Sequence, residues 1–163
     1  MAKFTLTSPD FADGGTVPDA QIFNGMGFKG GNVSPALAWS GAPAGTRSFA
    51  LMVHDPDAPT GSGWWHWVVY NIPSGTSSLS SGAGDPRKNL LPGGAIQGRT
   101  DFGTVGYGGP APPPGPKHNY HFRLHALKVD KLEVPADASA AMIGFNVWAQ
   151  GLGVAQLTGV YGV

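Results

Sequence analysis

The chain has 163 residues, of which 26 are glycine and 15 are proline, while only 12% are charged and the formal net charge is zero. Its five Trp, eight Phe and four Tyr exceed the aromatic content of disordered chains, so the glycine and proline indicate a folded domain rich in turns. The lack of a basic excess argues against nucleic acid or an anionic membrane surface as a partner, and the lack of cysteine excludes disulfides and thiol chemistry.

The length predicts a single domain over residues 1–163. No apolar run approaches the roughly 20 residues that a membrane helix needs, so we expect no stable membrane insertion. Residues 1–10 contain no apolar segment of the kind found in signal peptides, and we therefore expect a cytoplasmic protein.

The chain alternates between short strand-like segments and turn residues. Most of its pattern therefore predicts β-structure, and residues 64–71 are apolar on both parities, which is typical of a central strand covered on both faces. The predicted strands, each rich in β-branched or aromatic residues, are 4–6, 36–39, 47–54, 64–71, 118–127 and 154–161.

One helix is predicted, over residues 134–151. Asp137 or Ser139 can cap its start, and Gly151 can end it in a left-handed turn. Its helical spacing predicts one buried apolar stripe, formed by Ala138, Ala141, Met142, Phe145 and Ala149.

Two long irregular stretches, 10–35 and 73–117, separate the predicted strands. A compact domain rarely has such long loops unless they form a site or pack as structured coil. Residues 25–30 match the dinucleotide-binding pattern G-x-G-x-x-G, but Ser34 and Pro35 follow too soon for a helix, so we expect a loop there.

Side-chain alternation places four polar residues on the apolar faces of predicted strands: Asp55, His66, His118 and Tyr120. One such residue is usually a hydrogen-bonded core group, but four of them beside long loops favour a pocket.

A metal site at His118, His121 and His125 is less well supported. On a strand, the last two residues face one way and His118 faces the other, so the three imidazoles cannot meet.

Two sequence motifs resemble the phosphatidylethanolamine-binding protein (PEBP) family, also called the Raf kinase inhibitor protein family. The first is DPDAP at 55–59, followed by WHW at 65–67 and NIP at 71–73. The second is YGGPAPP at 107–113, running into HNY at 118–120. Residues 34–39 and 43–50 extend the similarity over nearly the whole chain, and its length and order are similar to the bacterial YbhB/YbcL branch.

This resemblance implies a large antiparallel sheet packed on a smaller one, with Greek-key connections and one or two peripheral helices. It also implies a pocket that binds small phosphorylated or other anionic ligands without catalysis, and no cofactor or metal. The pocket residues would be Asp55, Trp65, His66, Gly109, Ala111, Pro112, His118 and Tyr120.

In this interpretation a phosphate accepts hydrogen bonds from backbone amides near Gly109, from the two imidazoles and from the Tyr120 hydroxyl, while Asp55 orients a histidine. The sequence departs from the family pattern at Asn119, where an arginine is usual; on a strand Asn119 should point away from His118. The chain also ends at Val163, directly after a predicted strand, where mammalian members close the pocket with a helix.

Several alternatives remain open at this stage. The first is a hydrolase that uses Asp55, His66 and His118 as acid–base groups, although no recognisable Ser or Cys motif accompanies them. The second is a protein-interaction module that inhibits a kinase or a protease, as some family members do. The tryptophans at 64, 65 and 67 also permit a sugar-binding module, and the bacterial branch suggests a homodimer.

Overall fold

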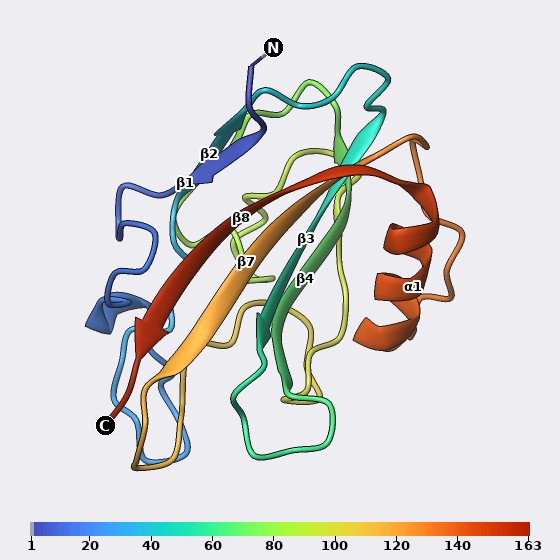
Figure 1. The fold of residues 1–163 in the computed structure, drawn as a ribbon. Coiled ribbons are helices and arrows are strands. Elements are labelled where there is room, and N and C mark those ends of the chain that lie inside the picture. The colour runs from blue at the N-terminus through green and yellow to red at the C-terminus, as the bar shows by residue number, and fades with distance from the viewer. Residues whose placement is uncertain (1) are drawn as a thin grey trace.

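The protein, seen here as a computed structural model that describes residues 2–163, contains two antiparallel sheets and one α-helix (Figure 1). In spatial order, the small sheet comprises β1 (Thr5–Thr7), β2 (Leu37–Ser40) and β5 (Ser78–Leu79). The large sheet comprises β6 (Ile96–Gln97), β4 (Trp64–Pro73), β3 (Ser48–Asp55), β7 (His118–Leu127) and β8 (Gly151–Tyr161).

All six predicted strands are confirmed, with ends that differ by three residues or fewer. The two stretches predicted to be irregular contain only β5, β6 and a 3-10 helix, η1 (Asp19–Gln21). The expected architecture, a large antiparallel sheet packed on a smaller one, is therefore the one observed.

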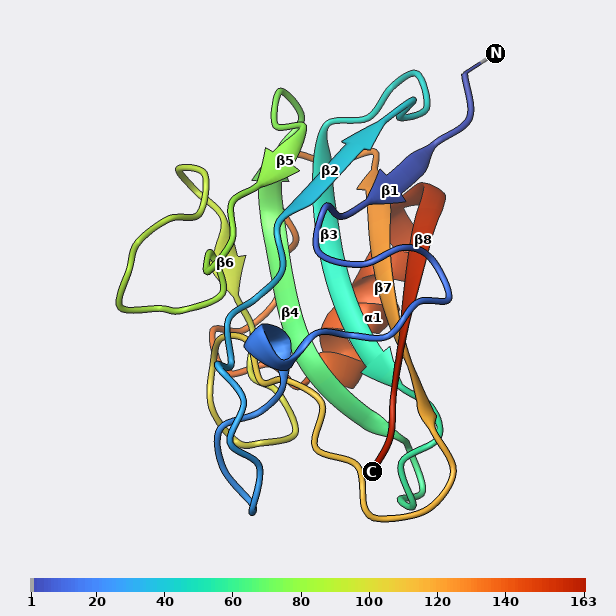
Figure 2. The same cartoon turned by 90° about the vertical axis from the view of Figure 1, so that its left-hand side faces the viewer.

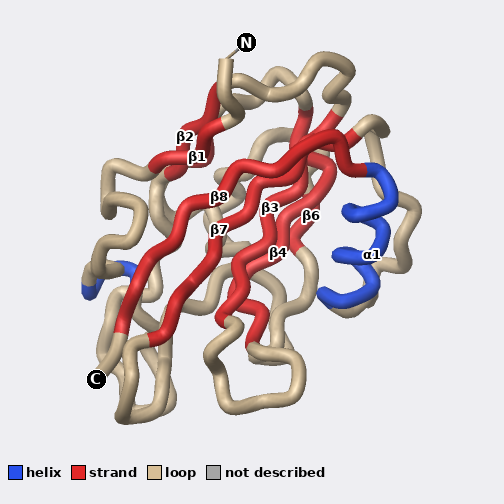
Figure 3. The backbone as a smooth tube through the Cα atoms, in the orientation of Figure 1, coloured by secondary structure: helices blue, strands red, loops and turns tan. Residues whose placement is uncertain are grey.

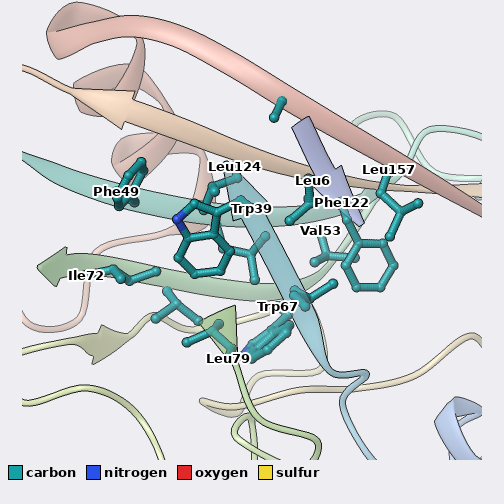
Figure 4. Packing of buried hydrophobic residues seen from close by; sticks show 14 of the residues in the cluster. Leu6, Trp39, Phe49, Val53, Trp67, Ile72, Leu79, Phe122, Leu124 and Leu157 are labelled. Atoms are coloured by element: carbon teal, nitrogen blue, oxygen red, sulfur yellow. The ribbon is translucent and has the colours of Figure 1, made fainter. Parts of the chain in front are cut away.

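The molecule has three layers, with the small sheet on one face of the large sheet and α1 (Ala140–Gln150) on the other (Figure 2). The main core lies between the two sheets (Figure 4). There Trp39 of β2 meets Phe49 of β3 edge-on, with ring centroids 5.6 Å apart, and Trp67 of β4 is fully buried. Truncating a buried aromatic of this size to alanine typically costs about 3–5 kcal/mol.

Strand β4 is covered on both faces, as its sequence predicts. Trp67 and Val69 face the core between the sheets, whereas Val68 and Tyr70 face α1. The middle strand of the sheet is nevertheless β3, because only the two-residue strand β6 lies beyond β4.

A helix is confirmed in the predicted region, but it begins at Ala140 rather than at residue 134, and the predicted buried stripe is wrong. Ser139 caps the helix, accepting a hydrogen bond from the amide of Met142 at 3.1 Å. The residues of α1 that pack on the sheet are Ala140, Ile143 and Val147, while Phe145 is 66% exposed. The helix is apolar on two sides, so the periodicity of the sequence could not tell which side meets the sheet.

The predicted end of the helix is also different. Gly151 is extended, with φ −71° and ψ 138°, because the chain passes directly from α1 into β8 without a left-handed turn.

Parts of both long irregular stretches lie at one end of the large sheet, where β3 ends and β4 and β7 begin (Figure 3). They pack as structured coil: the amide of Phe23 donates to Pro110 at 3.1 Å, and the amide of Gly108 donates to His66 at 2.9 Å. No helix within residues 2–163 is long and apolar enough to span a membrane.

Candidate functional site

A cavity of about 810 Å³ opens at this end of the large sheet. Its polar base is formed by Asp55 at the end of β3, His66 near the start of β4 and His118 at the start of β7. Its apolar wall comes from the irregular segments and from the first residue of β4: Met26, Phe28, Pro59, Trp64, Phe102, Ala111, Pro112, Pro113, Pro114 and Val163.

Asp55 and His118 form a buried pair at the base. His118 Nδ1 donates to Asp55 Oδ2 at 2.7 Å, and the two residues are 6% and 3% exposed. The other carboxylate oxygen accepts the amide of Asp57 at 2.8 Å, so the turn after β3 fixes the carboxylate as well. Both carboxylate oxygens of Asp55 therefore accept a hydrogen bond within the protein. This arrangement fixes the position of the His118 ring and places a proton on its Nδ1 in the absence of a ligand.

The turn that carries Asp55 is itself tied to β7. Asp57 Oδ2 accepts the backbone amide of Asn119 at 2.8 Å and its side-chain amide at 3.1 Å. These bonds, chiefly the backbone one, lower the pKa of Asp57. Asn119 thus points away from the cavity, as predicted, and holds the turn in place.

His66 is buried beside this pair, at 4% exposure. Its Nδ1 lies 2.7 Å from the carbonyl oxygen of Gly108. The ring is packed edge-on against Tyr120 and Phe102, with centroid distances of 5.2 Å and 5.5 Å. Burial lowers the pKa of His66 to about 4, against the opposing effect of the bond to Gly108.

The proline-rich loop lines the cavity and contains one backbone amide. Residues 110 and 112–114 are prolines, so Ala111 carries the only N–H in residues 110–114, and it has no hydrogen-bond partner within residues 2–163. Ala111 and Pro112 line the cavity, as the family resemblance implies.

Gly109 does not have the predicted role. Its amide donates to Asn32 Oδ1 at 2.8 Å and is therefore not available to an anion. The glycine is needed because the loop approaches the backbone at Gln21 and Phe23 so closely that a Cβ would overlap it.

Tyr120 does not line the cavity either. It lies under the two histidines at 1% exposure, and its hydroxyl has no hydrogen-bond partner within residues 2–163. Burial, with Asp55 nearby, raises the pKa of this hydroxyl, which stays protonated. Tyr120 thus forms the floor beneath the site.

Trp65 was predicted beside the pocket, but the structure places Trp64 there instead. Neighbouring residues of a strand face opposite ways, so Trp64 shares the face of His66, and Trp65 packs on His54 with ring centroids 4.2 Å apart. Strand parity could have identified Trp64 from the sequence.

Sequence reasoning missed two further contributors. Lys29, exposed at the rim, supplies the only Lys or Arg side chain among the residues that line the cavity, and it lies in the glycine-rich segment assigned to a loop. Phe102 forms part of the wall and stacks on Phe23 with ring centroids 4.4 Å apart. Nothing in the sequence pattern around Phe102 signals this position.

The donors and acceptors of this site suit recognition better than covalent chemistry. The one hydroxyl side chain that lines the cavity, Thr60, donates to the carbonyl of Gly63 at 2.6 Å and is not paired with a base. Within residues 2–163, no three His, Asp or Glu side chains converge on a point where a metal could bind.

The chain belongs to the phosphatidylethanolamine-binding protein family, whose family model matches residues 7–162. It is 50% identical to the Escherichia coli protein YbhB over 156 residues, covering 96% of this chain and 98% of that one. The crystal structure of E. coli YbcL, described as a member of the mammalian PEBP family, superimposes with a TM-score of 0.96 at 47% identity, covering 99% of both chains.

A more distant relative from Mycobacterium tuberculosis is named as the lipoprotein LppC. It is 36% identical over 158 residues, which cover 96% of this chain and 71% of that protein. Since a lipoprotein stands among the relatives, the cytoplasmic location expected from the sequence stays a prediction.

Proposed function

We propose that this protein binds a small phosphorylated ligand in the cavity without transforming it. The observation that carries this proposal is the buried pair of His118 and Asp55, which faces an apolar cavity with His66 and the free amide of Ala111 beside it. Protonated His118 and the amide of Ala111 are donors to an anionic oxygen. Lys29 at the rim adds a positive charge.

The size of the cavity supports a ligand larger than phosphate itself. Its volume of about 810 Å³ lies within the range of small-molecule sites, and most of its wall is apolar. A phosphate at the polar base with an organic group against Phe28, Trp64 or Phe102 accounts for both parts of the lining.

Other functions are less well supported. A hydrolase would need a nucleophile or a positioned water, and no hydroxyl of the lining is paired with His66 or His118. A sugar-binding platform would need exposed aromatic faces, but Trp67 is fully buried and Trp65 lies on the other side of the sheet. Regulation of a kinase or a protease stays a prediction.

Isothermal titration calorimetry with O-phosphoethanolamine at pH 6 tests the proposal. We expect saturable one-to-one binding, weakened at least about tenfold in His118→Ala, since a charge-assisted hydrogen bond is lost. His54→Ala, on the opposite face of the sheet, is the control and should leave the affinity unchanged. Absent binding, or equal binding by His118→Ala, would contradict the proposal.

A further inference from the structure

The hydrogen bond between His66 and Gly108 fixes which nitrogen of the imidazole carries a proton. A carbonyl oxygen only accepts hydrogen bonds, so His66 Nδ1 is the donor in this 2.7 Å contact. The amide of Gly108 donates back to the carbonyl of His66 at 2.9 Å, and the space beside Gly108 is filled by Phe102. His66 itself is 4% exposed, and its ring packs against Tyr120 and Phe102, with centroid distances of 5.2 Å and 5.5 Å.

The remaining nitrogen, Nε2, is a hydrogen-bond acceptor. Burial lowers the pKa of His66 to about 4, an effect that the Gly108 bond, Asp55 and the backbone of Gly109 only partly offset. Near neutral pH the ring is neutral, so Nε2 has a lone pair and no proton. It has no hydrogen-bond partner within residues 2–163, and His66 lines the cavity.

His118 differs, because its Nδ1 donates to the carboxylate of Asp55 rather than to a neutral carbonyl. When the ring of His118 is protonated, this carboxylate is its counter-ion, and its Nε2–H can donate to an anionic oxygen. The base of the cavity thus combines an acceptor at His66 with donors at His118 and Ala111.

We propose that the site selects the monoprotonated form of a phosphate monoester, whose P–OH donates to His66 Nε2 while its anionic oxygens accept from His118 and Ala111. This inference rests on the proposed function and adds the ligand's protonation state and ester class. A ligand oxygen without a proton would face the lone pair of Nε2, and an unpaired buried acceptor of this kind is costly.

Methyl phosphate and methyl sulfate provide a matched pair of probes. At pH 5.5 methyl phosphate is mostly a monoanion with one P–OH, because the second pKa of a phosphate monoester is about 6. Methyl sulfate carries the same charge and a similar shape but no proton. Dimethyl phosphate, a diester, is a second anion without P–OH.

Calorimetry at pH 5.5 should show methyl phosphate binding at least about tenfold more tightly than methyl sulfate or dimethyl phosphate. In His66→Gln the amide offers both a donor and an acceptor, so the preference should fall below about threefold. The control His54→Gln should keep the preference of the unmodified protein.

Equal binding of methyl phosphate and methyl sulfate would overturn this inference while leaving the proposed function intact. Equal binding of dimethyl phosphate would do the same. Failure of every phosphate and phosphate ester to bind would instead remove the proposed function, and this inference with it. If His66→Gln does not fold, the relative affinities of the three probes for the unmodified protein still test whether the site requires a P–OH donor.

Discussion

At the scale of single residues, the pocket depends on positions where the backbone of one loop touches that of another. A Cβ at Gly109 would overlap the carbonyl oxygen of Gln21 and come within 2.7 Å of the amide nitrogen of Phe23. These are backbone atoms that cannot move aside as a flexible side chain can. The glycine is needed here for close packing of the two loops, and its amide is already bound by Asn32.

We therefore predict that Gly109→Ala lowers the free energy of unfolding by about 2 kcal/mol or more, because the loop must shift. Gly93, which has nothing within 4 Å of an added Cβ, is the matched control. Gly93→Ala should change stability by no more than about 0.5 kcal/mol. Urea denaturation measures both, and equal effects of the two changes would contradict this account of the loop.

His66 makes stability depend on pH in a defined direction. Its pKa in the folded protein is about 4, below the ordinary value of 6.5, so the unfolded chain binds protons more readily. Stability should therefore fall as the pH drops from about 6.5 to 4, by up to about 3 kcal/mol from this residue. Below pH 4 this residue adds no further loss.

The pH dependence is measured by comparing denaturation of the protein and of His66→Gln at pH 7 and pH 4.5. The variant should lose less stability between the two values, although His125, whose pKa is also lowered by burial to about 4, contributes in both proteins. Parallel pH profiles would show that His66 is not held neutral in the fold.

At the scale of elements, the sequence pattern predicts the cap of α1 but not which side of the helix is buried. The cap at Ser139 is readable because a serine before an apolar periodic run is a known start signal. The buried side is not readable, since α1 has a second apolar stripe through Met142, Phe145 and Trp148. Only the packing of Ile143 on the sheet decides which side turns inward.

The cap can be tested against the alternative that the sequence left open. Ser139→Ala should destabilise the protein by about 1 kcal/mol, because the amide of Met142 loses its acceptor. Asp137→Ala should have a much smaller effect, since no hydrogen bond to its side chain is present among residues 2–163. Thermal denaturation of the two variants measures the effect. A larger loss of stability in Asp137→Ala than in Ser139→Ala would contradict the assignment of Ser139 as the cap.

At the scale of the whole molecule, the sequence predicted the layers and the polar base of the site. Strand alternation placed Asp55 and His118 on the core face between the sheets, and their motifs resemble those of the PEBP family. The same alternation grouped His66 with Val68 and Tyr70, which face α1. A register irregularity between β3 and β4, which the sequence pattern did not reveal, brings His66 to the cavity face beside Tyr120.

The role of Gly109 could not be predicted from the sequence. Its amide donates to the side chain of Asn32, which lies 77 residues away in the chain. Phe102 was missed for the same reason, since tertiary contacts alone bring it to the wall.

Ligand binding should also be visible in global stability. A phosphorylated ligand at a hundred times its dissociation constant should stabilise the fold by about 2.7 kcal/mol, which for a chain of this length raises Tm by roughly 5–10 °C. Differential scanning fluorimetry with O-phosphoethanolamine measures this shift. The same addition should raise Tm in His118→Ala by about half as much or less, because tenfold weaker binding reduces the stabilisation to about 1.4 kcal/mol. An equal rise in both proteins would place the ligand elsewhere.

The most direct test of the central claim is an NMR titration of the protein with inorganic phosphate at pH 5.5. We predict saturable chemical-shift changes at the amide of Ala111 and at the imidazoles of His66 and His118. The imidazoles of His54 and His121, on the opposite face of the sheet, should not change. Saturable changes confined to those two histidines, or none at Ala111, His66 and His118, would contradict an anion site in this cavity.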